Sequence, residues 1–254
     1  MGKAVREQSV RDRIKAQREE QRKKDRLRRI ATVTTVVIVA LGAIGAGWWY
    51  AANGSKPEEV TQALAPVTAS ADGSVVMSVA GVEKPVLDVY EDFQCPACRA
   101  MEETSGATIK NLAAEGKVKV VYHPITIFSQ DVNNGVTRGN SLRAGAASRC
   151  IPGGTAWAKF HDRLFKEQPA ETVEGFKLDD LVAWGKEAGV TAEGFATCVT
   201  SQQKAPEQAD YSTKILQAAG LSGTPTLKLN GTEIGNDVAF NPADLRKAVL
   251  DAAK

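Results

Sequence analysis

Two cysteines separated by two residues, Cys95 and Cys98, are the residues of this chain with the clearest chemistry. They follow a largely apolar run, residues 86–90, and precede a stretch that can form a helix. At a helix start, unpaired backbone N–H groups and the positive end of the helix dipole favour a thiolate on the first cysteine. The thiolate is the nucleophile in disulfide exchange. The spacing therefore predicts a redox pair in which Cys95 attacks and Cys98 resolves.

Two other interpretations of the Cys-x-x-Cys pattern remain open at this point. A structural zinc site needs four ligands and usually a second paired motif, whereas Cys150 and Cys198 stand singly and the chain has only two histidines. The pair can also form an inert structural disulfide. We expect no metal and no cofactor, and we interpret His123, at the end of a predicted strand, as a loop or packing residue.

The elements around the pair follow a strand–helix–strand order. Apolar patterning predicts strands over 74–80, 85–90 and 118–122 and a helix over 98–115. The second of these strands is almost continuously apolar, which suits a central strand buried on both faces. Strand, helix and strand within about 40 residues favour a parallel pair.

The rest of the chain is mostly helical and ends in a hairpin and a helix. Residues 129–220 contain almost no strand signal, and Trp157, Phe160 and Phe165 are spaced as the core of a helical block. We predict helices over 144–150, 156–168, 178–188, 193–202 and 206–220, strands over 226–229 and 232–234 joined by Asn230-Gly231, and a last helix opened by Asn241-Pro242. The fold class is therefore an α/β sheet interrupted by a helical block of roughly 75–90 residues.

The segment EDFQCPAC, residues 91–98, together with GTPT at 223–226 before a hairpin, resembles the DsbA-like branch of the thioredoxin superfamily. The order of elements is similar too: a βαβ start, a helical insertion and a ββα end. The resemblance covers roughly residues 70–254. It implies a thioredoxin-like fold with an inserted α-helical domain at about 129–205, and disulfide exchange with exported proteins.

The resemblance also implies roles for particular residues. Cys95 would be the attacking thiol and Cys98 the resolving one. Pro225 matches the family's cis-proline, which lies beside the redox pair where the backbone pairs with an extended substrate, and Thr224 before it holds a position that tunes redox behaviour. The implied substrate groove comprises Phe93, Pro96, Ala97, Thr224 and Pro225.

Two departures from the family concern the strength of the oxidant. Several thioredoxin-fold enzymes carry a buried acid six residues before the first cysteine, and here that position is Val89. Asp88, Glu91 and Asp92 are near, but strand alternation leaves their reach open. The dipeptide between the cysteines also lacks the histidine of the family's strongest oxidant. We expect a lowered pKa for Cys95 and a milder oxidant.

The remaining cysteines, Cys150 and Cys198, both fall in the helical block. If joined, they close a loop of about 49 residues, which the chain-entropy model values at about 4 kcal/mol. Some DsbA-like proteins carry an additional disulfide in this domain. We interpret the pair as a structural bridge, and a second redox pair that relays electrons is the alternative.

A basic tail and an apolar run open the chain. Residues 1–29 hold twelve Lys or Arg against five Asp or Glu, and 30–52 are 23 residues without a charge. A helix of that length spans about 34 Å, enough for a bilayer core of about 30 Å. Positive-inside bias then places the tail in the cytoplasm and the rest of the chain outside. We therefore interpret the basic tail as a topology signal rather than a nucleic-acid-binding arm. For the apolar run, a cleaved signal peptide ending near Ala51-Ala52 is the alternative to a membrane anchor.

These patterns predict four segments: a basic cytoplasmic tail (1–29), a transmembrane anchor (30–52), a polar linker (53–73) with a helical turn or two at 57–64, and a catalytic domain (74–254). All four cysteines follow the span, so they would lie in an oxidising compartment where disulfides persist. The predicted location is the cell membrane, crossed once, with the catalytic domain extracytoplasmic.

The leading prediction is a thiol–disulfide oxidase whose substrates are reduced exported proteins. By resemblance, a membrane DsbB-like or vitamin K epoxide reductase-like oxidase would reoxidise it. A disulfide isomerase or reductant of the same fold is the first alternative, although isomerases of this superfamily are usually dimers with a dimerisation domain for which 53–73 looks too short. A non-catalytic thioredoxin-like module that binds clients is the second alternative.

Overall fold

The computed structural model describes residues 56–254. The predicted basic tail over 1–29 and the predicted membrane span over 30–52 lie outside the described residues. Among residues 56–254, no helix is both long enough and apolar enough to cross a bilayer.

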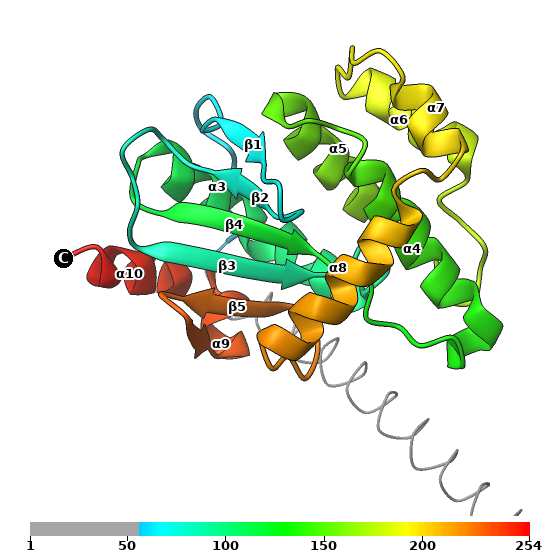
Figure 1. Ribbon diagram of the computed structural model, residues 1–254. Helices are drawn as coiled ribbons and strands as arrows, with labels where there is room; N and C mark the ends of the chain where they lie inside the picture. Colours follow the sequence, from blue (N-terminus) through cyan, green and yellow to red (C-terminus); the bar gives the residue numbers. More distant parts are fainter. Residues whose placement is uncertain (1–55) are drawn as a thin grey trace, which may run out of the picture. The chain divides into compact units, whose positions relative to one another are not determined.

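A six-stranded mixed sheet forms the centre of the domain, with strand order β1-β2-β4-β3-β5-β6 (Figure 1). The strands are β1 Val67–Ala69, β2 Val75–Met77, β3 Val86–Glu91, β4 Lys119–Pro124, β5 Thr226–Leu229 and β6 Thr232–Ile234. The parallel pairing of β3 with β4 confirms the predicted βαβ unit, and the other neighbours are antiparallel. The predicted hairpin at Asn230-Gly231 is confirmed between β5 and β6.

β3 lies in the interior of the sheet, and its two faces are not equally buried, since Val86 and Asp88 on one face are half-buried. Leu87 and Val89 are completely buried. β3 pairs with β4 along one edge and with β5 along the other. Only three residues separate its last residue, Glu91, from Cys95. A strand that is paired along both edges therefore positions the cysteines.

An interrupted helix connects β3 to β4. The helix α2 (Pro96–Met101), the π-helical segment η1 (Glu102–Gly106) and the helix α3 (Ala107–Ala114) follow one another directly. The helix predicted over 98–115 is therefore confirmed, with a start two residues earlier. Its predicted inner face is confirmed as well, since Met101, Ile109 and Leu112 are completely buried.

The helical block contains the short 3-10 helix η2 (Val132–Gly135), α4 (Val136–Ser148), α5 (Gly154–Lys166), α6 (Leu178–Glu187) and α7 (Phe195–Thr200), and α8 (Ala205–Ala218) leads back to the sheet. α4 begins eight residues before the predicted 144–150 because its first half buries polar groups instead of an apolar face. Thr137, Asn140 and Ser141 are buried there with hydrogen-bond partners. A disulfide joins Cys150, just after α4, to Cys198 of α7. The chain ends with α9 (Asn236–Ala239) and α10 (Pro242–Ala252), which Asn241 caps as predicted.

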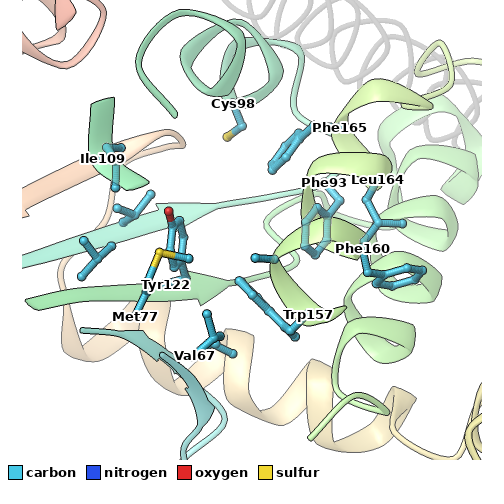
Figure 2. Packing of buried hydrophobic residues seen from close by; sticks show 14 of the residues in the cluster. Val67, Met77, Phe93, Cys98, Ile109, Tyr122, Trp157, Phe160, Leu164 and Phe165 are labelled. Atoms are coloured by element: carbon cyan, nitrogen blue, oxygen red, sulfur yellow. The ribbon is translucent and has the colours of Figure 1, made fainter. Parts of the chain in front are cut away.

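The insertion and the sheet share one hydrophobic core. Trp157 and Phe160 of α5, expected as core residues, are buried with Phe165 of the same helix. The Trp157 ring lies against Tyr122 of β4, with 5.5 Å between ring centroids, and Figure 2 shows the aromatic side chains of α5 beside those of the sheet. The helical block is therefore a packed part of the same folding unit, because its main apolar face is buried on the sheet.

The linker predicted over 53–73 is too long. β1 lies inside it, and residues 57–64 form no helical turn. Glu58 is held instead by Arg246 of α10, with Nε–Oε1 and Nη2–Oε2 distances of 2.9 and 2.8 Å, and by Asn111 of α3 at 3.0 Å. The partners are 53 and 188 residues away in the chain, so the polar composition of this stretch gave no sign of its docking.

Candidate active site

Cys95 is the N-cap of α2, the residue immediately before the first helical position. Its backbone is extended (φ −79°, ψ 118°), and Pro96 occupies the first helical position, where an N–H group has no intrahelical partner. The Sγ atom of Cys95 accepts a hydrogen bond from the backbone N–H of Cys98 at 3.4 Å. The sulfur thus takes the place of an ordinary capping oxygen, where negative charge is stabilised.

The two thiols differ in exposure and in pKa. Cys95 is 6% exposed and Cys98 is 0% exposed, so an incoming group can reach only Cys95. The pKa of Cys95 is lowered, chiefly by a hydrogen bond from the Cys98 side chain and further by Thr224 and the Cys98 N–H, although burial opposes the shift. Burial is the main cause that raises the pKa of Cys98 well above its usual value. Cys95 is therefore the nucleophilic thiolate, and Cys98 is the buried resolving thiol.

The loop before β5 closes the site from the other side. The Thr224–Pro225 peptide bond is cis, as the resemblance implied. The Cys95 thiol donates to the backbone carbonyl of Thr224 at 3.3 Å. Because β5 pairs directly with β3, the sheet brings together two motifs that are 129 residues apart in the chain.

Asp92 anchors the loop between β3 and the redox pair. Its Oδ1 atom accepts from the Gln94 N–H at 2.8 Å, and its Oδ2 atom accepts from the Ile127 N–H at 2.9 Å and the Ser141 hydroxyl at 2.8 Å. Burial raises the pKa of this carboxyl to about 6, against the effect of these donors. The Asp92 N–H donates to the Cys98 sulfur at 3.5 Å. Asp92 thus ties the redox loop to the segment after β4 and to α4, and its charge opposes the neighbouring thiolate.

A buried network of charged side chains joins β3, the connecting helix and α5. His161 Nε2 lies 2.6 Å from Glu91 Oε1, and its Nδ1 lies 3.2 Å from Asp162 Oδ1. Lys110 Nζ lies 2.6 Å from Asp162 Oδ1 and 3.4 Å from Glu102 Oε2. Burial alone would lower the pKa of His161, but the carboxylates of Glu91 and Asp162 raise it to about 10. These carboxylates favour the protonated imidazole, while burial raises the pKa of Glu91 against the opposing effect of His161.

The same network offers a possible metal geometry, because ligand atoms of Glu91, Glu102 and His161 lie within 4.8 Å of one another. Lys110 and the protonated His161 already supply positive charge to these carboxylates. An internal ion network therefore fits these residues better than a metal centre. Cys150 and Cys198 are bonded to each other, so they cannot serve as further zinc ligands beside Cys95 and Cys98.

The structure gathers most of the predicted groove residues around Cys95. Pro96 is exposed, and Ala97, Thr224 and Pro225 are half-buried. The prediction for Phe93 is wrong, because Phe93 is 1% exposed and packs with Phe165 at a centroid distance of 5.1 Å (Figure 2). The His161 ring centroid lies 5.6 Å from that of Phe93. Helix α5 of the insertion covers this ring, a contact across about 70 residues that local sequence does not reveal.

Three functional neighbours had no assigned role in the sequence analysis. Asp92 was named only as a nearby acid, and His161 and Gln168 reach the redox loop from the insertion. A polar residue that breaks an apolar helical face, as His161 does between Phe160 and Phe165, was the available signal. His123 contacts Tyr211 at 2.7 Å and Asp88 at 3.0 Å, which fits its interpretation as a packing residue.

Comparisons with known proteins agree with this geometry. The family model described as thioredoxin matches residues 82–251, more than half of the chain. The reduced disulfide bond oxidoreductase DsbG from Mycobacterium tuberculosis is 28% identical, with a TM-score of 0.58 over 73% of this chain and 86% of that one. Oxidised DsbA from the same organism is 28% identical, with a TM-score of 0.58 over 74% and 92%. MdbA, a thiol-disulfide oxidoreductase from Corynebacterium matruchotii, is 26% identical, with a TM-score of 0.58 over 72% and 93%. No curated protein matches the chain.

A reactive Cys-x-x-Cys at the start of a helix, faced by a cis-proline in the loop before β5, defines a thioredoxin-fold thiol–disulfide oxidoreductase. The chain belongs to the thioredoxin family, with the helical insertion of its DsbA-like branch. It is a protein thiol–disulfide oxidoreductase.

Proposed function

We propose that this oxidoreductase is an extracytoplasmic oxidase that donates disulfides to exported proteins through Cys95 and Cys98. The observation that carries the proposal is the pKa asymmetry of the pair: the pKa of Cys95 is lowered and that of Cys98 is raised. A stabilised Cys95 thiolate favours the reduced enzyme, so the oxidised enzyme gives up its disulfide readily.

The oxidised enzyme carries a Cys95–Cys98 disulfide. A substrate thiolate attacks the Cys95 sulfur, which is the accessible one, and a bond forms between substrate and Cys95 while the bond to Cys98 breaks. Cys98 leaves with the electron pair and takes a proton, because its raised pKa favours the thiol. A second substrate thiolate then attacks the substrate sulfur of this mixed disulfide. Cys95 leaves as the thiolate that its hydrogen bonds stabilise, and the substrate keeps the new disulfide.

The accessible apolar residues near Cys95 support an extended polypeptide as substrate. Pro96 is exposed, and Ala97 and Pro225 are half-buried, so apolar surface next to the redox pair is partly accessible. The backbone on either side of Pro225 belongs to a loop that enters β5, so an extended segment can pair with it as a short added strand. Unfolded, reduced chains present such segments, and folded proteins seldom do.

The cellular setting of the proposal rests on the sequence. The 23 uncharged residues over 30–52 after a basic tail support a single membrane anchor with the catalytic domain on the far side. A membrane oxidase of the DsbB-like or vitamin K epoxide reductase-like kind would then reoxidise the pair. Mapping the accessibility of an introduced cysteine at residue 20 and of one at residue 70 in intact cells tests this topology.

Replacing Cys95 separates catalysis from simple client binding. We expect Cys95→Ser to abolish oxidative refolding of a reduced test protein, and Cys98→Ser to accumulate a mixed disulfide through Cys95. Unchanged refolding by Cys95→Ser would support the non-catalytic binding module instead.

A redox titration separates oxidase from reductant or isomerase. Thioredoxin has a reduction potential of about −270 mV, and the strong oxidant DsbA about −120 mV. We expect a value above about −200 mV for the full chain, since Cys95 is stabilised as a thiolate but Asp92 opposes its charge. A potential close to that of thioredoxin would overturn the oxidase proposal and leave the enzyme class intact.

A further inference from the structure

The segment after α5 is linked to the redox loop by reciprocal side-chain amide hydrogen bonds. Gln168 Nε2 donates to the Phe93 carbonyl at 2.8 Å and to the Cys95 carbonyl at 3.0 Å. In the opposite direction, Gln94 Nε2 donates to the Pro169 carbonyl at 2.8 Å. Three hydrogen bonds therefore connect the insertion to the three residues that end in the reactive cysteine.

We propose that Gln168 is a positioning residue for disulfide exchange: by donating to the Phe93 and Cys95 carbonyls, it fixes the start of α2 and supports the Cys95 thiolate.

The Gln168 side chain contacts the reactive residue itself through the Cys95 carbonyl. This carbonyl also accepts the Arg99 N–H at 3.1 Å, the first hydrogen bond of the helix. The Cys98 N–H, two peptide groups further on in the same helical turn, donates to the Cys95 sulfur. A donor that holds the carbonyl in place therefore holds the capping geometry of the sulfur.

The amide also contributes directly to the electrostatics of the site. The Nε2 hydrogens carry partial positive charge and are donated to the backbone carbonyl of the residue that bears the reactive sulfur. The backbone carbonyls of this loop would otherwise present partial negative charge to the thiolate. Donation from Gln168 offsets that charge, whereas the Asp92 carboxylate adds to it.

The place of Gln168, just after α5, explains why the insertion supplies this contact to the redox loop. Phe93 is completely covered by α5, and the first residues after the helix then lie against the backbone next to that ring. Gln168 is half-buried, so its amide is partly shielded from water. The helical insertion thereby acts on the reactivity of the pair and does more than enlarge the core.

The test compares Gln168→Leu and Gln168→Glu with Gln217→Leu, an exposed glutamine on α8, in the full-length chain in detergent micelles. Leucine removes both donated hydrogen bonds, and ionised glutamate removes them and adds a negative charge. We expect the Cys95 pKa, read from thiolate absorbance at 240 nm, to rise in the order wild type, Leu, Glu. We expect the equilibrium constant for oxidation of the enzyme by oxidised glutathione to rise at least threefold for Leu and more for Glu, with Gln217→Leu equal to wild type.

A purely structural role would lower the melting temperature without producing this order. If Gln168→Leu folds and leaves both the Cys95 pKa and the glutathione equilibrium unchanged, the proposal is wrong. If the Leu variant does not fold, Gln168→Glu, which keeps the length and shape of the side chain, decides by the same two measurements.

Discussion

His161 Nε2 and Glu91 Oε1 lie 2.6 Å apart, and both side chains are at most 1% exposed. One residue belongs to the inserted helix α5 and the other to the last position of β3. This buried pair therefore joins the insertion to the strand that carries the redox loop.

Removing one partner of this pair is expected to be costly. His161→Gln leaves Glu91 buried without its cation, and breaking a buried pair in this way typically costs about 3–5 kcal/mol. We expect a fall of that order in the free energy of unfolding, measured by urea denaturation. The double variant His161→Gln/Glu91→Gln should recover part of the loss, because no uncompensated charge remains. A single variant as stable as the wild type would contradict the assignment of charge to this pair.

Because of the raised pKa of His161, we expect the free energy of unfolding to fall at alkaline pH. Its pKa in the folded protein, about 10, lies above the ordinary 6.5. Its stabilisation is therefore complete below about pH 6.5 and is lost as the pH rises through about 10. The free energy of unfolding of the wild type should fall between about pH 7 and pH 10, and that of His161→Gln should fall less. Equal slopes for the two proteins would show that His161 is not held as a cation.

Asp92 is expected to restrain the oxidising strength of the enzyme. Its carboxylate raises the pKa of Cys95, and the carboxyl, with a pKa of about 6, is mostly ionised at neutral pH. Asp92→Asn should therefore lower the pKa of Cys95 and raise the reduction potential, where a tenfold change in equilibrium corresponds to about 30 mV. Thiolate absorbance and a glutathione titration measure the two quantities. Asp88→Asn is the matched control, because Asp88 pairs with His123. A higher Cys95 pKa in Asp92→Asn would reverse the assigned sign.

The Cys150–Cys198 disulfide is expected to stabilise the insertion without taking part in turnover. It closes a loop with a sequence separation of 48, worth up to about 4 kcal/mol in the chain-entropy model. Replacing both cysteines by serine should lower the free energy of unfolding by about 2–4 kcal/mol and leave the refolding activity per folded molecule unchanged. Activity lost at full stability would favour the electron-relay alternative.

The sequence was sufficient for the parts of the fold that depend on local pattern. The βαβ unit, the Asn230-Gly231 hairpin and the Asn241 cap follow from apolar periodicity and from residues with defined backbone preferences. The sequence pattern did not predict the first half of α4. Its buried residues Thr137, Asn140 and Ser141 are polar and make hydrogen bonds to distant loops. Burial achieved through polar contacts leaves no hydrophobic period to detect.

The reactive pair was likewise predictable, whereas its surroundings were not. Cys95, Cys98 and Pro225 carry motifs that fix their role. Phe93 was misplaced because the aromatic ring suits either a groove or a core, and only the position of α5 decides between them. Gln168 reaches the loop from 73 residues away in sequence, and an amide in a loop has no distinguishing local signal.

The pairing of β5 with β3 has a consequence for how the chain is made. Cys95 and Cys98 precede the Thr224–Pro225 loop by more than 120 residues in the chain. β5, the strand that follows this loop, is synthesised after every other strand of the sheet except β6. A chain that emerges with its N-terminus first exposes two reactive thiols well before the loop that controls them exists. During synthesis, therefore, the young polypeptide is itself a candidate for unwanted cross-linking, and selectivity arises only when the sheet is complete.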